Sequence, residues 1–245
     1  MIRSLHLRYR METTSGLIYK LNQYRSVIFR LYLSKKYLRG NGLEIGAMGN
    51  PMRVFNGAHV SYVDRYTADD LKSDFPLKEG RYVDVNIIDD GQYLVKIPDN
   101  SVDFVIANHV LEHYEDPIMA IKTAIRVLRP GGVLFLTVPD KRQTFDVDRS
   151  ITSLEHLIQD HCVGPMVSRE DHFSDNFDKK NYSVPNYEKY IADTPRKREY
   201  IHYHIWTDKE IVELLSYIEK EWQLGFSILN VKNAWFENIF IVKKL

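Results

Sequence analysis

The feature that most constrains this chain is an apolar strand that runs into an acid and a glycine turn, Leu43–Asn50, with the sequence LEIGAMGN. A second apolar strand, His59 to Val63, is closed by another acid, Asp64, twenty positions after Glu44. Glycines let the backbone approach a ligand closely, and an acid at the tip of the second strand can hold ribose hydroxyls. A strand, a glycine turn, a helix and an acid-tipped second strand therefore predict the nucleotide-binding half of an α/β fold.

The acid that precedes the glycine turn, Glu44, indicates which kind of nucleotide the site can bind. The turn has only two glycines, Gly46 and Gly49, where a dinucleotide-binding loop has three. Glu44 precedes Gly46 by two residues, where it would repel a pyrophosphate and suit a cationic ammonium group. The sequence therefore favours a nucleoside that carries an amino acid over a dinucleotide. A plain strand-to-helix turn remains the alternative reading.

Strands and helices alternate along most of the chain. Further apolar segments predict strands at residues 82–88, 102–107, 133–138, 226–231 and 238–242, and helices at 117–128 and 208–220. This pattern predicts a doubly wound, mostly parallel seven-stranded α/β sheet. Residues 141–205 are polar and rich in histidine and tyrosine, which predicts a long insertion after the fifth strand. We expect three units: residues 1–40, residues 41–140 with 206–245, and the insertion.

The first 40 residues predict a basic amphipathic helix. Their apolar stripe consists of Leu17, Leu21, Tyr24, Ile28 and Leu31, at spacings of four, three, four and three. Nine lysines and arginines oppose a single acid there, although the whole chain has no net charge. Such a segment suits contact with an anionic membrane surface, a nucleic acid, a phosphorylated substrate or a partner such as a glycosyltransferase. A solvated helix face is the simpler alternative.

The composition of the chain predicts the cellular location of the protein. The 245 residues suffice for one large α/β domain, and the single cysteine, Cys162, excludes an intrachain disulfide. The chain has neither an apolar run of membrane-spanning length nor the pattern of a secretory signal peptide. A cytoplasmic location is the expectation.

One segment allows a family resemblance to be stated. Residues 98–113, PDNSVDFVIANHVLEH, followed by LRPGGVL at 128–134, closely resemble the class I S-adenosylmethionine-dependent methyltransferases over residues 40–140. The resemblance implies a Rossmann-like methyltransferase fold with S-adenosylmethionine as cofactor. It places Glu44 near the methionine end, Asp64 at the ribose, and Asp90 with Gly91 at the adenine. The implied cofactor-binding residues are Glu44, Gly46, Ala47, Gly49, Asp64, Arg65, Asp90, Gly91, Asn108 and His109.

The insertion raises the question of the acceptor. It holds five of the nine histidines, and it resembles the insertion of methyltransferases linked to bacterial cell-surface glycan synthesis. Methyl transfer to a sugar hydroxyl needs a general base, for which we rank His172 first, then His204, then His156. Arg142 and Arg169 are candidates to hold an anionic sugar or phosphate. A divalent metal that acidifies a sugar diol is the alternative, but no known zinc spacing is present, so no metal is expected.

The sequence is also compatible with other functions. The domain could be a catalytically silent cofactor-binding scaffold of a glycan-assembly complex, or a methyltransferase of another small molecule or of nucleic acid. The neutral net charge disfavours nucleic acid, and so does Asn108–Leu111, which lacks the Asn/Asp-Pro-Pro-Tyr/Phe motif at that point. The acceptor expected is a small molecule or glycan.

Overall fold

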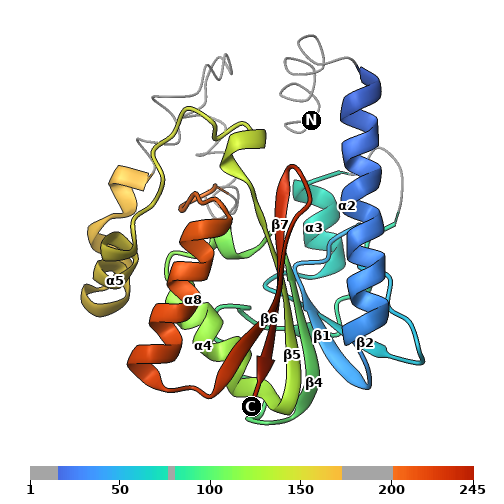
Figure 1. The fold of residues 1–245 in the computed structure, drawn as a ribbon. Helices are drawn as coiled ribbons and strands as arrows, with labels where there is room; N and C mark the ends of the chain where they lie inside the picture. The colour runs from blue at the N-terminus through green and yellow to red at the C-terminus, as the bar shows by residue number, and fades with distance from the viewer. Residues whose placement is uncertain (1–15, 77–80, 173–200) are drawn as a thin grey trace.

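The computed structural model describes residues 16–76, 81–172 and 201–245. Its centre is one seven-stranded sheet in the order β3-β2-β1-β4-β5-β7-β6 (Figure 1). The first five strands are parallel, and β7 runs antiparallel between β5 and β6. The predicted doubly wound, mostly parallel seven-stranded fold is confirmed.

The bounds of the elements follow the predicted order closely. The strands are β1 (Asn41–Ile45), β2 (His59–Asp64), β3 (Ile87–Ile88), β4 (Val102–Asn108), β5 (Leu128–Pro139), β6 (Phe226–Asn233) and β7 (Glu237–Lys244). Within the described residues, the α-helices are α2 (Gly16–Tyr37), α3 (Ala68–Asp74), α4 (Pro117–Val127), α5 (Leu154–Val163) and α8 (Asp208–Trp222). Short 3₁₀ turns are η1 (Leu111–His113), η2 (Lys141–Gln143) and η3 (Pro165–Val167).

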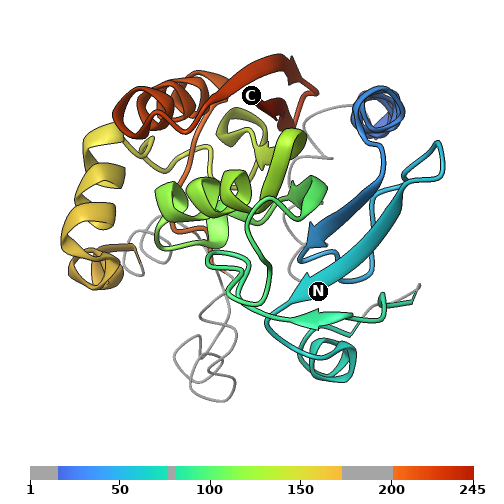
Figure 2. The same cartoon turned by 90° about the horizontal axis from the view of Figure 1, so that it is seen from below.

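Apolar side chains cover both faces of the sheet, because neighbouring residues of a strand point to opposite sides. In β4, Val105 and Ala107 join the core under α4 and α8, whereas Phe104 and Ile106 join the core under α2. Figures 1 and 2 show α4 and α8 on one side of the sheet and α2 on the other. The central strands are therefore buried on both faces, as a parallel sheet requires.

The helix predicted between the first two strands is absent from the described residues, so this prediction is wrong. Residues 46–58 instead form turns and irregular loop. Pro51 cannot donate to a helical ladder, and the backbone N–H of Met52 donates to Glu44. Asn56 and Gly57 take left-handed backbone angles, which also end a helix. The N-terminal helix α2 covers this part of the sheet, with Leu33 and Leu38 in the core.

The face of α2 that packs on the sheet also differs from the prediction. Tyr24 and Ile28 of the predicted stripe are 66% and 61% exposed, while Ser26, Leu33 and Ser34 are buried. The two serines are buried because each has a polar partner: Ser26 donates to Glu237, and Ser34 donates to the Arg53 carbonyl. An apolar stripe alone therefore identified the wrong face of this helix.

The third strand is shorter than the predicted 82–88. Only Ile87 and Ile88 pair regularly with β2, at the edge of the sheet. Before them, the N–H of Val83 donates to Met48 O and that of Asn86 donates to Tyr62 O. These single hydrogen bonds hold the stretch beside its neighbours, but it is not paired as a regular strand. The described part of the insertion packs through α5 on α4 and α8. Among the described residues, no helix is both long and apolar enough to cross a membrane.

Candidate functional site

The strand order places a topological switch point at the carboxyl ends of β1 and β4. The chain runs outward from β1 through β2 to β3, then returns to begin β4 on the other side of β1. Ligands of doubly wound sheets bind outside the strand ends at such a switch point. The predicted cofactor residues Glu44, Asp64 and Asn108 lie among the last two residues of β1, β2 and β4, and Asp90 follows β3 by two.

Glu44 is a buried carboxylate at this switch point. It is 1% exposed, and its two oxygens accept the Met52 N–H at 2.9 and 3.0 Å. Asn108 Nδ2 lies 3.5 Å from Glu44 Oε1. Burial raises the pKa of Glu44 to about 7, against the smaller opposing effect of these hydrogen bonds. The folded protein thus holds a carboxyl that would gain from a cationic partner.

The turn after β1 explains why its first glycine is needed. Gly46 has φ +64°, and a Cβ there would lie 2.7 Å from Val110 Cγ1. Its N–H donates to Val63 O at 2.9 Å, which continues the contact of β1 with β2. Met48 takes the left-handed region as well, with φ +50°, at a position where glycine is the usual residue. The turn keeps its shape with two glycines because Met48 accepts this backbone strain.

The ribose and adenine candidates lie together at the next two strand ends. Arg65 bridges from β2 to Asp90, with Nη2 3.2 Å from Oδ1 and 3.1 Å from Oδ2. Burial raises the pKa of Asp64, despite the N–H groups of Tyr66 and Arg65 that lower it. A Cβ on Gly91 would lie 2.1 Å from the Tyr114 hydroxyl oxygen, so only glycine fits there. Acids at three neighbouring strand ends, one of them beside a glycine turn, fit an amino-acid-bearing nucleoside.

The end of β4 joins a buried polar network that sequence reasoning missed. His109 Nε2 lies 2.6 Å from Glu237 Oε2, and its Nδ1 lies 3.5 Å from Glu112 Oε1. Glu237 also accepts from Ser26 and from Arg30, whose Nε lies 2.8 Å from Oε1. Burial would lower the pKa of His109, but the two carboxylates outweigh it and the pKa is raised. Burial would raise the pKa of Glu237, but His109 and Arg30 hold it well below its ordinary value.

Arg30 and Ser26 therefore tie the N-terminal helix to the predicted cofactor site. The sequence offered no signal for them, because the predicted apolar stripe put Tyr24 and Ile28 on the packed face of the helix. A single chain gives no sign of their partner Glu237, which lies more than 200 positions away.

A second cluster lies beside η1. Glu112 is 1% exposed, and neither of its oxygens makes a well-formed hydrogen bond with a described residue. Candidate ligand atoms of Glu112, His113 and His202 lie within 4.8 Å of one another. His202 Nδ1 lies 2.6 Å from Asp146 Oδ2, and Asp146 Oδ1 accepts from Arg149 at 2.9 Å. Burial lowers the pKa of His113 to about 4, and its Nδ1 contacts the Ile201 carbonyl.

This cluster borders a small cavity. The cavity measures about 10 Å³, which is room for about one water. Its lining residues are Glu112, Pro139, Lys141, Thr144, Asp146, His202, His204, Ile205 and Trp206. The imidazole–carboxylate pair His202–Asp146 was not among the predicted catalytic residues. Neither a sequence motif nor the spacing of the two residues indicates that they form a pair.

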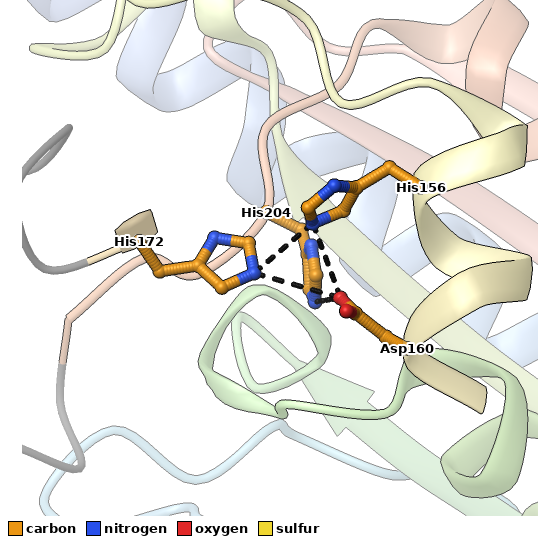
Figure 3. Close-up of side chains that lie close together, drawn as sticks. All are labelled: His156, Asp160, His172 and His204. Atoms are coloured by element: carbon orange, nitrogen blue, oxygen red, sulfur yellow. Dashed lines mark hydrogen bonds and ion pairs between the residues drawn. The ribbon is translucent and has the colours of Figure 1, made fainter. Parts of the chain in front are cut away.

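The three histidines predicted as bases come together in a third cluster, with Asp160 (Figure 3). His204 and Asp160 are each 1% exposed, whereas the His156 side chain is 33% exposed. Burial lowers the pKa of His204 to about 3, helped by the neighbouring His172. Burial would raise the pKa of Asp160, but the nearby imidazoles of His156 and His172 and the Ser168 hydroxyl hold it well below its ordinary value. Their role as bases stays a prediction.

The two arginines predicted to hold an anionic acceptor are both in ion pairs. Arg142 contacts Asp140 and Asp208, at 2.5 and 2.7 Å. Arg169 contacts both oxygens of Glu115, at 2.5 and 2.7 Å. An acceptor phosphate would have to compete with these carboxylates.

The chain is similar in sequence to known methyltransferases. The methyltransferase domain family matches residues 31–184. A protein of Mycolicibacterium smegmatis, described as a probable S-adenosylmethionine-dependent methyltransferase, is 39% identical over 69 residues. The match covers 28% of this chain and 26% of that protein, so the chain spans about a quarter of the curated relative.

Two solved structures are similar in shape. A structure of a SAM-dependent methyltransferase from Methanosarcina mazei is 19% identical, over 86% of this chain and 95% of that one, with a TM-score of 0.46. A protein from Pyrococcus horikoshii OT3 is 15% identical, over 98% of this chain and 92% of that one, with a TM-score of 0.47.

Proposed function

Because this chain belongs to the class I S-adenosylmethionine-dependent methyltransferases, we propose that it methylates a hydroxyl group of a sugar, in a cell-surface glycan or its precursor. When bound, the cofactor supplies a methyl group already activated on a sulfonium sulfur. Glu44 would hold the cofactor's ammonium group, Asp64 its ribose hydroxyls, and Asp90 with Gly91 its adenine. The protein must then align the acceptor oxygen with the methyl carbon, exclude water and take up one proton.

The observation that supports a hydroxyl acceptor is the pair His202–Asp146. The carboxylate of Asp146 can only accept, so at 2.6 Å it fixes the proton on His202 Nδ1 and the lone pair on Nε2. An imidazole oriented by a buried carboxylate is a common arrangement for a general base. This pair lies beside Glu112, which is on η1, four residues after the end of β4. We propose His202 as the group that takes the hydroxyl proton.

An assay of methyl transfer tests this assignment. His202→Ala should lower kcat about 10²–10⁴-fold while calorimetry finds unchanged affinity for S-adenosylmethionine. His161→Ala is the matched control, because His161 is also paired with a carboxylate, Asp116 at 2.8 Å, but lies on α5 against α4. Equal kcat values for wild type and His202→Ala would refute the base assignment.

The acceptor class needs a separate measurement. Mass spectrometry of the cell-surface glycan, with and without an active copy of this protein, should reveal one methyl group that depends on it. An unchanged glycan, with active methyl transfer to another small molecule or to nucleic acid, would overturn the sugar proposal and leave the methyltransferase intact. Failure to bind S-adenosylmethionine at millimolar concentration would instead contradict the enzyme proposal itself.

We also propose that α2 places the protein on an anionic membrane surface. Tyr24, Val27, Ile28 and Tyr32 are more than half exposed on this helix, and Arg25, Lys35 and Lys36 are exposed near them. Apolar residues beside basic ones are typical of helices that lie in a membrane interface. Sedimentation with phosphatidylserine vesicles should capture wild type and lose Tyr24→Ser/Ile28→Ser. No capture of wild type would leave a protein partner, such as a glycosyltransferase, as the occupant of this face.

A further inference from the structure

We propose that the third cluster is a zinc site, formed by His156, Asp160, His172 and His204 (Figure 3). One candidate ligand atom from each residue lies within 4.8 Å of the other three. They come from three parts of the chain: α5, the helical residues 169–172, and the segment 201–206. Figure 3 shows the three imidazoles and the carboxylate turned towards one another. This proposal concerns residues outside the predicted cofactor pocket and does not depend on methyl transfer.

The separations among three of the four residues match a tetrahedral metal shell, and His204 Nε2 lies 3.9 Å from Asp160 Oδ2. His156 Nε2 lies 3.1 Å from His172 Nε2 and 3.1 Å from Asp160 Oδ2. His172 Nε2 lies 3.5 Å from the same carboxylate oxygen. Zinc bonds of about 2.0–2.1 Å in a tetrahedron place neighbouring ligand atoms about 3.4 Å apart. The three atoms therefore already have the spacing of a zinc shell.

Hydrogen bonds from outside the cluster orient Asp160 and His204 as metal ligands. Ser168 Oγ donates to Asp160 Oδ1 at 2.5 Å, which leaves Oδ2 facing the imidazoles. The Glu115 carbonyl can only accept, so His204 Nε2, at 3.3 Å, carries the proton and Nδ1 carries the lone pair. Metal-binding histidines commonly donate their other ring N–H to a carbonyl in this way.

The cluster is poorly satisfied by protein groups alone. His204 Nδ1 and Asp160 Oδ2 are buried, and neither makes a well-aligned hydrogen bond within the described part of the chain. The Nε2 atoms of His156 and His172, 3.1 Å apart, can share only one proton, because a second would make two N–H donors face each other. A divalent cation resolves this conflict, since it takes the lone pairs of neutral imidazoles and the charge of one carboxylate.

The ligand set indicates the metal and its role. Three imidazoles and one carboxylate suit zinc better than magnesium or calcium, which prefer oxygen ligands. Four protein ligands complete a tetrahedral shell, which is typical of structural zinc rather than of catalytic sites with an open position. The ion would fasten α5 and residues 169–172 to the segment that carries His202. These histidines would then be unavailable as general bases.

Metal analysis of the full chain tests the site. After dialysis against Zn²⁺ and then against zinc-free buffer, inductively coupled plasma mass spectrometry should find about one zinc per chain. His172→Ala and Asp160→Asn should each weaken Zn²⁺ binding by at least tenfold. Ser168→Ala, which keeps all four ligands, should weaken it about 10–100-fold. Substitution with Co²⁺ should give the visible absorption of a tetrahedral complex.

Two controls separate this site from chance binding. His59→Ala removes an exposed histidine, and Cys162→Ser removes the exposed thiol of α5, so both should bind Zn²⁺ as wild type does. Circular dichroism shows which variants fold. If a variant that lacks a ligand does not fold, Ser168→Ala still tests the site, because it keeps all four ligands. Wild-type protein without zinc, unchanged affinity in Asp160→Asn and Ser168→Ala, or loss of binding in Cys162→Ser would each overturn the proposal.

Discussion

Replacing Glu44 with glutamine separates the energetic penalty of a buried carboxylate from its use in binding. Glu44 is 1% exposed, and burial raises its pKa from the ordinary 4.5 to about 7. At about 1.4 kcal/mol per pKa unit, this shift corresponds to about 3 kcal/mol of unfolding free energy. Glutamine has similar volume and keeps one oxygen to accept the Met52 N–H, but it does not ionise.

The sign of the effect follows from the raised pKa. The folded protein favours the protonated carboxyl, so this contribution to stability is full below pH 4.5 and is lost as the pH rises through about 7. Cofactor-free Glu44→Gln should therefore match wild type near pH 4.5. At pH 8 it should be more stable by about 2–3 kcal/mol, a rise in Tm of roughly 4–12 °C for a domain of this size.

Thermal unfolding between pH 4.5 and 8.5, followed by circular dichroism, measures this difference. Glu213→Gln is the control, because Glu213 is exposed on α8 and its replacement should change stability by less than about 0.5 kcal/mol. Glu44→Gln should also bind S-adenosylmethionine about 10–100-fold more weakly at pH 7.5, since it loses a charged partner for the ammonium group. A variant that is less stable than wild type at pH 8, or that binds the cofactor equally well, would refute this reasoning.

Three further substitutions test other parts of the site. Arg30→Ala leaves the buried Glu237 short of a cation and should lower the unfolding free energy in urea by about 2–4 kcal/mol. The exposed Lys35→Ala on the same helix should change it by less than about 0.5 kcal/mol, and equal effects of the two would contradict the network. Asp64→Asn should weaken cofactor binding in calorimetry about tenfold or more with little change in Tm, and a normal affinity would remove it from the ribose site. Gly91→Ala should lower the unfolding free energy by about 1–3 kcal/mol, because its Cβ would overlap a neighbouring hydroxyl; an unchanged Tm would show that the loop gives way freely.

The sheet was predictable because its signals are local. Each buried strand is a short apolar run between turn residues, and alternation alone divides residues such as Phe104 and Val105 between two faces. The helix at Pro117–Val127 was predictable for the same reason, since proline begins it and a stripe of isoleucines packs it on the sheet. None of these features needs knowledge of a distant partner.

The predictions that failed concern features that depend on contacts between distant residues or on polar contacts. Ser26 is buried because Glu237 accepts its hydroxyl, so the packed face of α2 depends on a residue in the last strand. The missing helix after β1 depends on Glu44 capturing the Met52 N–H, a contact that apolar periodicity does not encode. Asp160 was overlooked as a partner of His156, although their spacing of four residues on one helix was visible. What joins them to His172 and His204 is tertiary structure.

The N-terminal helix is part of the candidate site, although it precedes the first strand. Arg30 Nη2 donates to Thr137 Oγ1 at 3.3 Å, and that hydroxyl donates to Asn108 Oδ1 at 3.1 Å. Because the amide oxygen of Asn108 is engaged by Thr137, its nitrogen must face Glu44 Oε1, 3.5 Å away. A continuous path of polar contacts therefore runs from α2 through β5 and β4 to the carboxylate at the end of β1. Any partner that shifts α2 on the sheet would alter the donors around Glu44, and with them the charge that this carboxyl carries near neutral pH.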